Sequence, residues 1–196
     1  MNRIVIFMLA LFVFSCASRE TGPMYVLQID RAEDAPVLRA PSRDLTRREL
    51  KSPRIKNLMA RMLATVQSPE QDGVGIAAPQ VGENLRIIWV QRLDKSGEPF
   101  ECYLNAHIDS LYGEIKTGPE GCLSVPPYRG EVARWQDLIL SYVSPETLLP
   151  ARDTVHGFTA VIFQHECDHL DGILYIDRAD TVYIDPVWQA EIASRE

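Results

Sequence analysis

A short helical pattern with two histidines four residues apart constrains the fold of this chain most strongly. Residues 158–170 (FTAVIFQHECDHL), introduced by Gly157, are nearly continuous in apolar side chains before His165, which predicts a buried helix. His165, Glu166 and His169 form an H-E-x-x-H pattern within it. Residues four apart lie on one face of a helix, so both imidazoles can hold one metal ion, with Glu166 within reach of a water there. Burying these polar groups without partners would be costly, and a metal site explains their presence.

Two imidazoles do not complete a catalytic metal site, because such sites normally have three protein ligands and one open position. Cys122, within residues 120–124 (EGCLS), is the best candidate for the third ligand, since the glycines around it allow an unusual backbone approach. The alternative for Cys122 is a small buried hydrophobe, the commonest fate of a free cysteine. That alternative fits Cys102, in a predicted strand, and Cys167, in the helix, better.

A third segment rich in small residues occupies positions 73–80 (GVGIAAPQ). It is not a nucleotide-binding loop, because the third glycine of that fingerprint is missing and a helix cannot run through Pro79. Small residues instead let the backbone pass close to a ligand or metal. Gln80 at the end of the segment offers a side-chain N–H donor.

Taken together, these three segments resemble the peptide deformylase family. Residues 73–80, 120–124 and 164–172 (QHECDHLDG) are complete matches to the family's motifs and occur in the family's order. The resemblance runs from about residue 24 to about residue 180 and includes residues 36–39 (PVLR). It implies metal-dependent hydrolysis of the formyl group from short N-formyl-methionyl peptides.

The resemblance also implies a role for individual residues. Cys122, His165 and His169 would bind one divalent ion, with a water in the fourth position; Fe²⁺ is the ion that family members commonly use, and Zn²⁺ can also occupy the site. Glu166 would be the general base and later the acid for the leaving amine. The implied donors to the oxyanion are the Gln80 side chain and the Leu123 backbone N–H. The residues implied for substrate binding are Val74, Gly75, Gly121, Phe158, Val161 and Ile162.

Hydrophobic periodicity predicts an α+β fold. Apolar residues recur at helical spacing over residues 55–66, which indicates an amphipathic helix facing a core. We expect strands at residues 85–90, 100–104, 108–113 and 138–143, a turn-rich stretch at 117–130, and a short helical turn in 185–196. Together with the resemblance, these elements predict mixed antiparallel sheets around the buried helix that carries the H-E-x-x-H motif.

The first sixteen residues have the character of a bacterial lipoprotein leader. Arg3 precedes an unbroken apolar run over residues 4–14, and Ser15 places a small residue before Cys16. The run is too short to span a membrane as a helix, and its charge and length are typical of a signal peptide.

These features divide the chain into a signal peptide (1–16), a polar tether (17–35) and a catalytic domain (36–196). They predict an enzyme lipid-modified at Cys16 and anchored to a membrane outside the cytoplasm. The alternative is translation from Met24, which would give a cytoplasmic enzyme.

Charge argues against polyanionic partners. The formal net charge is −7, and no basic patch is dense enough to indicate nucleic-acid binding. Residues 179–196 contain one arginine and are otherwise acidic or apolar, which argues against docking on the ribosome.

Two other functions stay open at this stage. A metallopeptidase of different specificity would share H-E-x-x-H but is disfavoured by the intact 120–124 motif, and a non-catalytic lipoprotein that keeps the fold is disfavoured by the retained Glu166.

Overall fold

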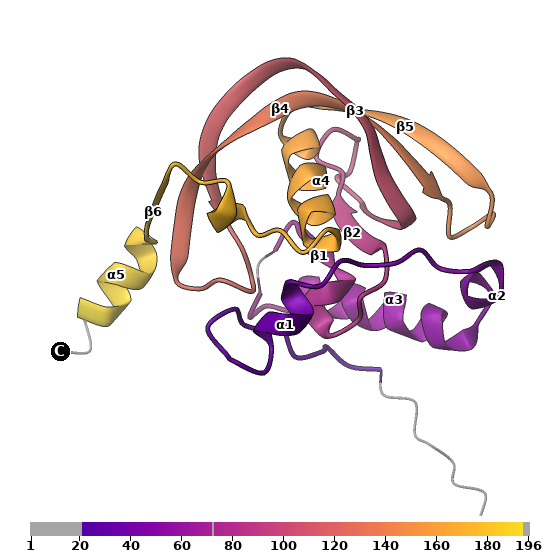
Figure 1. Ribbon diagram of the computed structural model, residues 1–196, viewed down its shortest axis with the longest axis horizontal. Coiled ribbons are helices and arrows are strands. Elements are labelled where there is room, and N and C mark those ends of the chain that lie inside the picture. The colour runs from indigo at the N-terminus through magenta and orange to yellow at the C-terminus, as the bar shows by residue number, and fades with distance from the viewer. Residues whose placement is uncertain (1–20, 72, 194–196) are drawn as a thin grey trace, which may run out of the picture.

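The central element of the molecule is helix α4, around which a strongly curved sheet is wrapped (Figure 1). The computed structural model describes residues 21–71 and 73–193. The α-helices are α1 (Ala35–Leu38), α2 (Arg47–Leu50), α3 (Pro53–Val66), α4 (Gly157–Leu170) and α5 (Pro186–Ala193), with 3₁₀ turns η1 (Ala78–Val81) and η2 (Tyr175–Asp177). The strands are β1 (Gly75–Ala77), β2 (Ile87–Gln91), β3 (Phe100–Gly121), β4 (Tyr128–Val143), β5 (Pro150–His156) and β6 (Thr181–Ile184).

All six strands form one sheet in the order β1-β2-β3-β4-β5, and β6 pairs with the first residues of β4. Every pairing between these strands is antiparallel. The predicted α+β architecture with a buried motif helix is therefore confirmed, although a single sheet replaces the several sheets that we expected. Figure 1 shows β3, β4 and β5 arching over α4.

The predicted strands at 100–104 and 108–113 are one long strand, and the turn-rich stretch predicted at 117–130 is shorter than expected. β3 continues to Gly121, and β4 begins at Tyr128. Glycine and proline at positions 118 and 119 indicated a turn, but the ladder with β4 carries the backbone through them. Irregularities in that ladder, between Leu104 and His107 and again between Tyr112 and Ile115, allow so long a strand to bend around α4.

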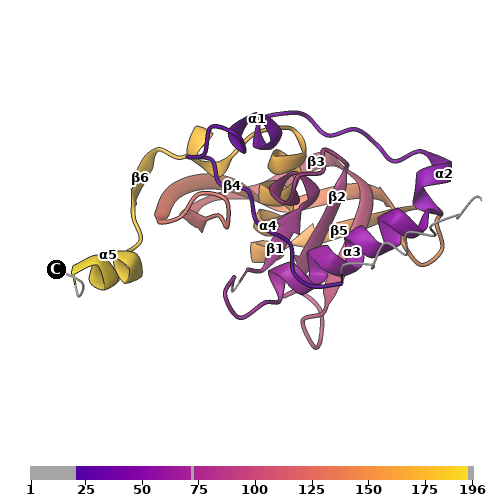
Figure 2. The same ribbon diagram turned by 90° about the horizontal axis from the view of Figure 1, so that it is seen from below.

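The two main predicted helices are confirmed. Ser52 caps α3 by accepting a hydrogen bond from the N–H of Ile55 at 3.2 Å, and the apolar face of α3 packs against the β1–β2 side of the sheet. Figure 2 shows α3 on that side. α4 is buried along most of its length, with Phe163 and Leu170 fully covered. Cys102 and Cys167 are each buried in a hydrophobic cluster, as expected for small hydrophobes.

The catalytic domain begins before Pro36, earlier than the predicted boundary. Met24 donates its backbone N–H to Thr65 Oγ1 at 2.8 Å, and Val26 is only 5% exposed. Leu27 N–H donates to the carbonyl of Gln80 at 2.8 Å. Residues 24–29 therefore pack on the domain, because they supply backbone donors and an apolar side chain to its core, and only the earlier part of residues 17–35 remains a candidate tether.

The predicted signal peptide and the lipidation site Cys16 lie outside the described residues. Within residues 21–71 and 73–193, no helix combines the length and the apolar character needed to cross a membrane.

Candidate metal centre and active-site cleft

Three side chains from distant parts of the chain meet at one point. Cys122 follows the end of β3, whereas His165 and His169 stand one turn apart on α4. One ligand atom from each lies within 4.8 Å of the other two, and Cys122 Sγ is 3.1 Å from His169 Nε2. A thiolate with two imidazoles is a donor set that suits Zn²⁺ and Fe²⁺. The predicted ligand set is thus assembled by the fold.

Buried groups around this point have the character of a metal centre. Nδ1 of His169 and Oε2 of Glu166 are both buried without a hydrogen-bond partner in the described part of the chain. Such unpaired polar atoms are rare in native interiors, and a missing ion or ordered water is one explanation for them. The residues present therefore fit a bound divalent ion.

His165 is oriented by a carboxylate that lies behind it. Its Nδ1 is 2.8 Å from Oε2 of Glu120, and because a carboxylate only accepts, the imidazole N–H donates. This contact leaves Nε2 of His165 available to a metal. Arg134 in turn donates to both oxygens of Glu120, from Nε at 2.7 Å and from Nη2 at 3.1 Å. Burial acts to raise the pKa of Glu120, but the hydrogen bonds from His165 and Arg134 together outweigh it and lower the pKa to about 2.

The network extends to Asp168, one turn or less from both histidines on α4. Nη1 of Arg134 donates to Oδ2 of Asp168 at 2.6 Å, and Arg178 donates to both oxygens of Asp168 at 2.6 Å. Sequence reasoning did not identify Arg134 and Arg178 as part of the site. The available signal was Asp168, an acidic residue on a helix predicted to be buried, which required a cationic partner from elsewhere in the fold.

Glu166 points its carboxylate at the backbone of Gly75. The side chain is 3% exposed, and burial raises the pKa of Glu166 to about 7. A Cβ placed on Gly75 would lie 2.9 Å from Cδ of Glu166, so only glycine leaves room for the carboxylate. We expected small residues in the 73–80 segment, and at Gly75 the reason is the space that the Glu166 carboxylate occupies.

The two predicted oxyanion donors lie beside the place where the side chains of Cys122, His165 and His169 meet, which we call the metal point. Gln80 is 2% exposed, and its Oε1 accepts the N–H of Ala77 at 2.8 Å. This bond turns the amide nitrogen of Gln80 toward Cys122 Sγ at 3.5 Å and Ser124 Oγ at 3.3 Å. The backbone N–H of Leu123, next to Cys122, has no acceptor among the described residues. Both predicted donors therefore lie next to Cys122.

A cleft of about 670 Å³ opens over this point, within the usual size range of ligand sites. The predicted site residues that line it are Val74, Gly75, Gln80, Gly121, Cys122, Leu123, Phe158, Val161, Ile162, His165 and Glu166. His169 is not on the cleft surface: it is 1% exposed and lies beneath Cys122. Asp185 and Trp188, from the C-terminal segment, also line the cleft and were not predicted.

Comparison with known proteins agrees with the site. The polypeptide deformylase family model matches residues 26–183. The chain belongs to the peptide deformylase family. A peptide deformylase of Desulforudis audaxviator is 41% identical over 82% of this chain and 97% of its own length. A second peptide deformylase, from Leptospira biflexa, is 35% identical over 73% of this chain and 82% of its own.

Solved deformylase structures share the fold. A class I type b peptide deformylase from Acinetobacter baumannii superimposes with a TM-score of 0.71 at 36% identity, covering 80% of this chain and 99% of its own. The deformylase of Thermotoga maritima gives 0.69 at 31% identity, over 81% and 99%. This deformylase is therefore a hydrolase, and its reaction is metal-dependent removal of the formyl group from N-formyl peptides.

Proposed function

We propose that the cleft hydrolyses short N-formyl-methionyl peptides with Cys122, His165 and His169 as the metal ligands. The observation that carries this assignment is the convergence of these three side chains beneath a cleft whose walls bear Glu166 and Gln80. A bound divalent ion would supply Lewis acidity there, which would polarise a carbonyl and lower the pKa of a water toward neutrality.

Glu166 moves the proton in this proposal. Its carboxylate takes a proton from the attacking water as the oxygen bonds to the formyl carbon, and then delivers that proton to the amide nitrogen as the C–N bond breaks. The products are formate and a free amino terminus. The buried position of Glu166 against Gly75 supports this role, because Oε2 of the carboxylate has no hydrogen-bond partner among the described residues and is therefore available to a water.

Gln80 and Leu123 stabilise the charge that develops on the formyl oxygen. The Gln80 amide is held by its bond to Ala77, and the Leu123 N–H has no acceptor within residues 21–71 and 73–193. Preorganised donors of this kind act without reorganisation during the reaction, and the loss of one typically costs about 2.7–4 kcal/mol of barrier.

The substrate methionine binds against the exposed face at the start of α4. Phe158 is 57% exposed in the free cleft, and Val161 and Ile162 follow it along the same wall. Val74, Gly75 and Gly121 flank the cleft with backbone groups that can pair with an extended peptide. A deformylase from Acinetobacter baumannii has been solved with Met-Ala-Ser bound, and that structure is 34% identical to this chain.

The proposal is tested on protein purified without its first sixteen residues under anaerobic conditions. We expect one divalent ion per chain, most often Fe²⁺ with Zn²⁺ as the alternative, and rapid release of formate from formyl-Met-Ala. His169→Ala should lose both metal and activity, whereas His156→Ala, at an exposed residue before α4, should keep both. Full activity in metal-free protein would overturn the assignment, as would cleavage of internal peptide bonds in unformylated peptides.

For localisation, we propose that the mature chain is lipid-modified at Cys16 and held outside the cytoplasm. The support is the leader-like composition of residues 1–16 and the start of the folded domain at about Met24, which leaves only a few residues between anchor and enzyme. Mass spectrometry of the amino terminus of protein from the native host, with membrane fractionation, decides the question. Recovery of a cytoplasmic protein that starts at Met24 would refute the anchor and leave the catalytic assignment intact.

A further inference from the structure

The C-terminal helix α5 is held against the cleft by Asp185. This residue is 9% exposed, and its backbone N–H donates to the carbonyl of Pro127 at 2.9 Å. Its carboxylate forms an ion pair with Arg129 and accepts the N–H of Val187 at 2.8 Å. Because these bonds join the first turn of α5 to the start of β4, the helix has a defined position beside the cleft although it extends from the end of the molecule (Figure 2).

The sheet ladder gives the distance between β6, the strand that precedes α5, and the neighbour of Cys122. Gly121, the neighbour of Cys122, pairs with Arg129 on β4, and Arg129 pairs with Tyr183 on β6. Adjacent strands are 4.7–4.9 Å apart, so Tyr183 is roughly 10 Å from Gly121 across the sheet. An extended peptide advances about 3.3–3.6 Å per residue, and this distance therefore corresponds to about three substrate residues.

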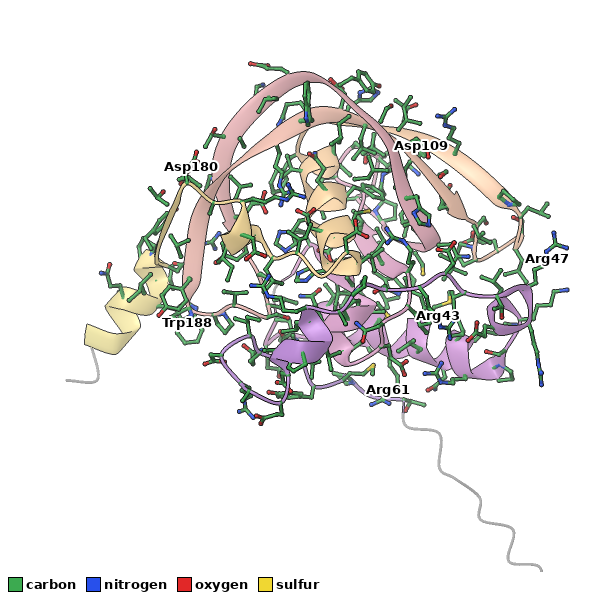
Figure 3. All side chains as sticks on the ribbon, in the orientation of Figure 1. Arg43, Arg47, Arg61, Asp109, Asp180 and Trp188 are labelled. Carbon is green, nitrogen blue, oxygen red and sulfur yellow. The ribbon has the colours of Figure 1, made fainter. Side chains whose placement is uncertain are left out.

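Trp188 faces this end of the cleft. It lines the same cavity as Cys122 and Glu166, together with Pro126, Pro127 and Tyr128. Figure 3 shows Trp188 on the side of α5 that faces the rest of the molecule. The side chain is 46% exposed, and its indole N–H has no hydrogen-bond partner among the described residues. A rigid, half-buried aromatic ring with a free donor is a common anchor for a ligand.

We propose that Trp188 is a specificity-determining residue that contacts the second or third substrate residue after formyl-methionine and favours an apolar or aromatic side chain there. The inference rests on the proposed deformylation and adds a selectivity that the metal centre does not determine. Asp185, which lines the cleft near Trp188, is paired with Arg129, so its charge is balanced, and the indole with its proline and tyrosine neighbours supplies the apolar part of this wall.

Steady-state kinetics of the metal-loaded enzyme tests the selectivity. The substrates are formyl-Met-Ala, formyl-Met-Ala-Phe and formyl-Met-Ala-Asp. We expect the wild type to prefer the Phe peptide over the Asp peptide about 10-fold in kcat/KM, and Trp188→Ala to reduce that ratio to about 1–2 by raising KM for the Phe peptide. Activity on formyl-Met-Ala should change less than about twofold, because that substrate is too short to reach α5.

Matched variants separate the ring from the helix. Trp188→Phe should keep most of the preference, and Val187→Ala, at a neighbour that is 75% exposed and does not line the cleft, should keep all of it. An unchanged Phe-to-Asp ratio in Trp188→Ala would overturn the proposal. Equal losses on all three substrates would also overturn it, since they would indicate a structural role for Trp188.

A binding measurement makes the inference independent of turnover. The chain has three tryptophans, so the fluorescence of wild-type protein titrated with the deformylated peptide Met-Ala-Phe can be compared with that of Trp188→Phe. We expect a change on binding that Trp188→Phe loses, and tighter binding of Met-Ala-Phe than of Met-Ala-Asp. If the protein gives this fluorescence signal but does not turn over substrate, the proposed reaction is rejected and the role of Trp188 is supported. If the protein turns over substrate but Trp188→Phe binds the peptides like the wild type, only the role of Trp188 is rejected.

Discussion

Glu120 and His165, which are 45 residues apart in sequence, are joined by a hydrogen bond of 2.8 Å behind the metal centre. The contact fixes the ring of His165 and determines which of its nitrogens carries the proton. Arg134 completes the arrangement by holding the same carboxylate through two hydrogen bonds. The orientation of one predicted ligand therefore depends on strands β3 and β4 as much as on its own helix.

Replacement of this carboxylate should weaken metal binding. We expect Glu120→Gln to lower the metal affinity about 10–100-fold, because partners of this kind orient the ligand and raise its basicity. Competition with a chelator of known affinity measures the effect. Glu114→Gln, at an exposed carboxylate on the same strand, is the matched control and should bind metal like the wild type. Equal affinities in Glu120→Gln and the control would show that Glu120 does not support the ligand.

Loss of the proposed general base should separate metal binding from turnover. Glu166→Gln keeps the shape of the side chain but removes the proton acceptor, so we expect a normal metal content and a drop in kcat of about 10²–10⁴-fold. Elemental analysis and a formate-release assay give the two readouts. Glu98→Gln, at an exposed residue outside the cleft, serves as the control. Turnover close to that of the wild type would refute the role of Glu166.

Gly75 should be intolerant of even one added carbon. An alanine Cβ would approach the Glu166 carboxylate too closely, so the carboxylate must shift away from the metal point. We expect Gly75→Ala to lower kcat by at least about tenfold, since general-base catalysis depends on a carboxylate within hydrogen-bond reach. Gly118→Ala, where an added Cβ has no neighbour within 4 Å, provides the comparison and should retain full activity. Wild-type rates for Gly75→Ala would show that the carboxylate is not held in place by this contact.

A second buried arginine should affect stability and leave the site unchanged. Arg92 is 2% exposed and pairs with Asp94 at 2.7 Å and with Asp153 at 2.6 Å. Removing one member of a buried pair leaves the other charge unpaired, and because these carboxylates are partly exposed we expect Arg92→Met to destabilise the fold by about 1–3 kcal/mol. Urea denaturation at neutral pH measures this loss. Lys95→Met, at an exposed partner of Glu101, should cost less than about 1 kcal/mol.

The same ion pair predicts a pH dependence. The hydrogen bond from Arg92 holds the pKa of Asp94 below its usual value of 3.8. A carboxyl with a depressed pKa in the folded state contributes its stability above the unfolded pKa and loses it as the pH falls through the folded value. The difference in unfolding free energy between the wild type and Arg92→Met should therefore shrink below about pH 4. A difference that stays constant down to pH 2 would contradict the assignment of this stability to the ion pair.

Local sequence determined much of this protein. The spacing of His165 and His169 on an apolar helix is enough to predict two ligands on one face, because the helical repeat is a property of the backbone and does not depend on the rest of the fold. The amphipathic pattern of α3 was sufficient for the same reason. The motif around Cys122 predicted the third ligand from its residues and from the family resemblance, and the fold brings the three side chains together.

Contacts between distant segments were decided only by the tertiary structure. Glycine and proline near position 118 indicated a turn, yet pairing with β4 keeps the strand intact to Gly121, because ladder hydrogen bonds outweigh a local preference. The bond from His165 to Glu120, the fit of Glu166 against Gly75 and the place of Trp188 beside the cleft join residues from separate elements. No local pattern specifies such pairs, since they arise when the sheet closes around α4 and buries polar groups that must then find partners.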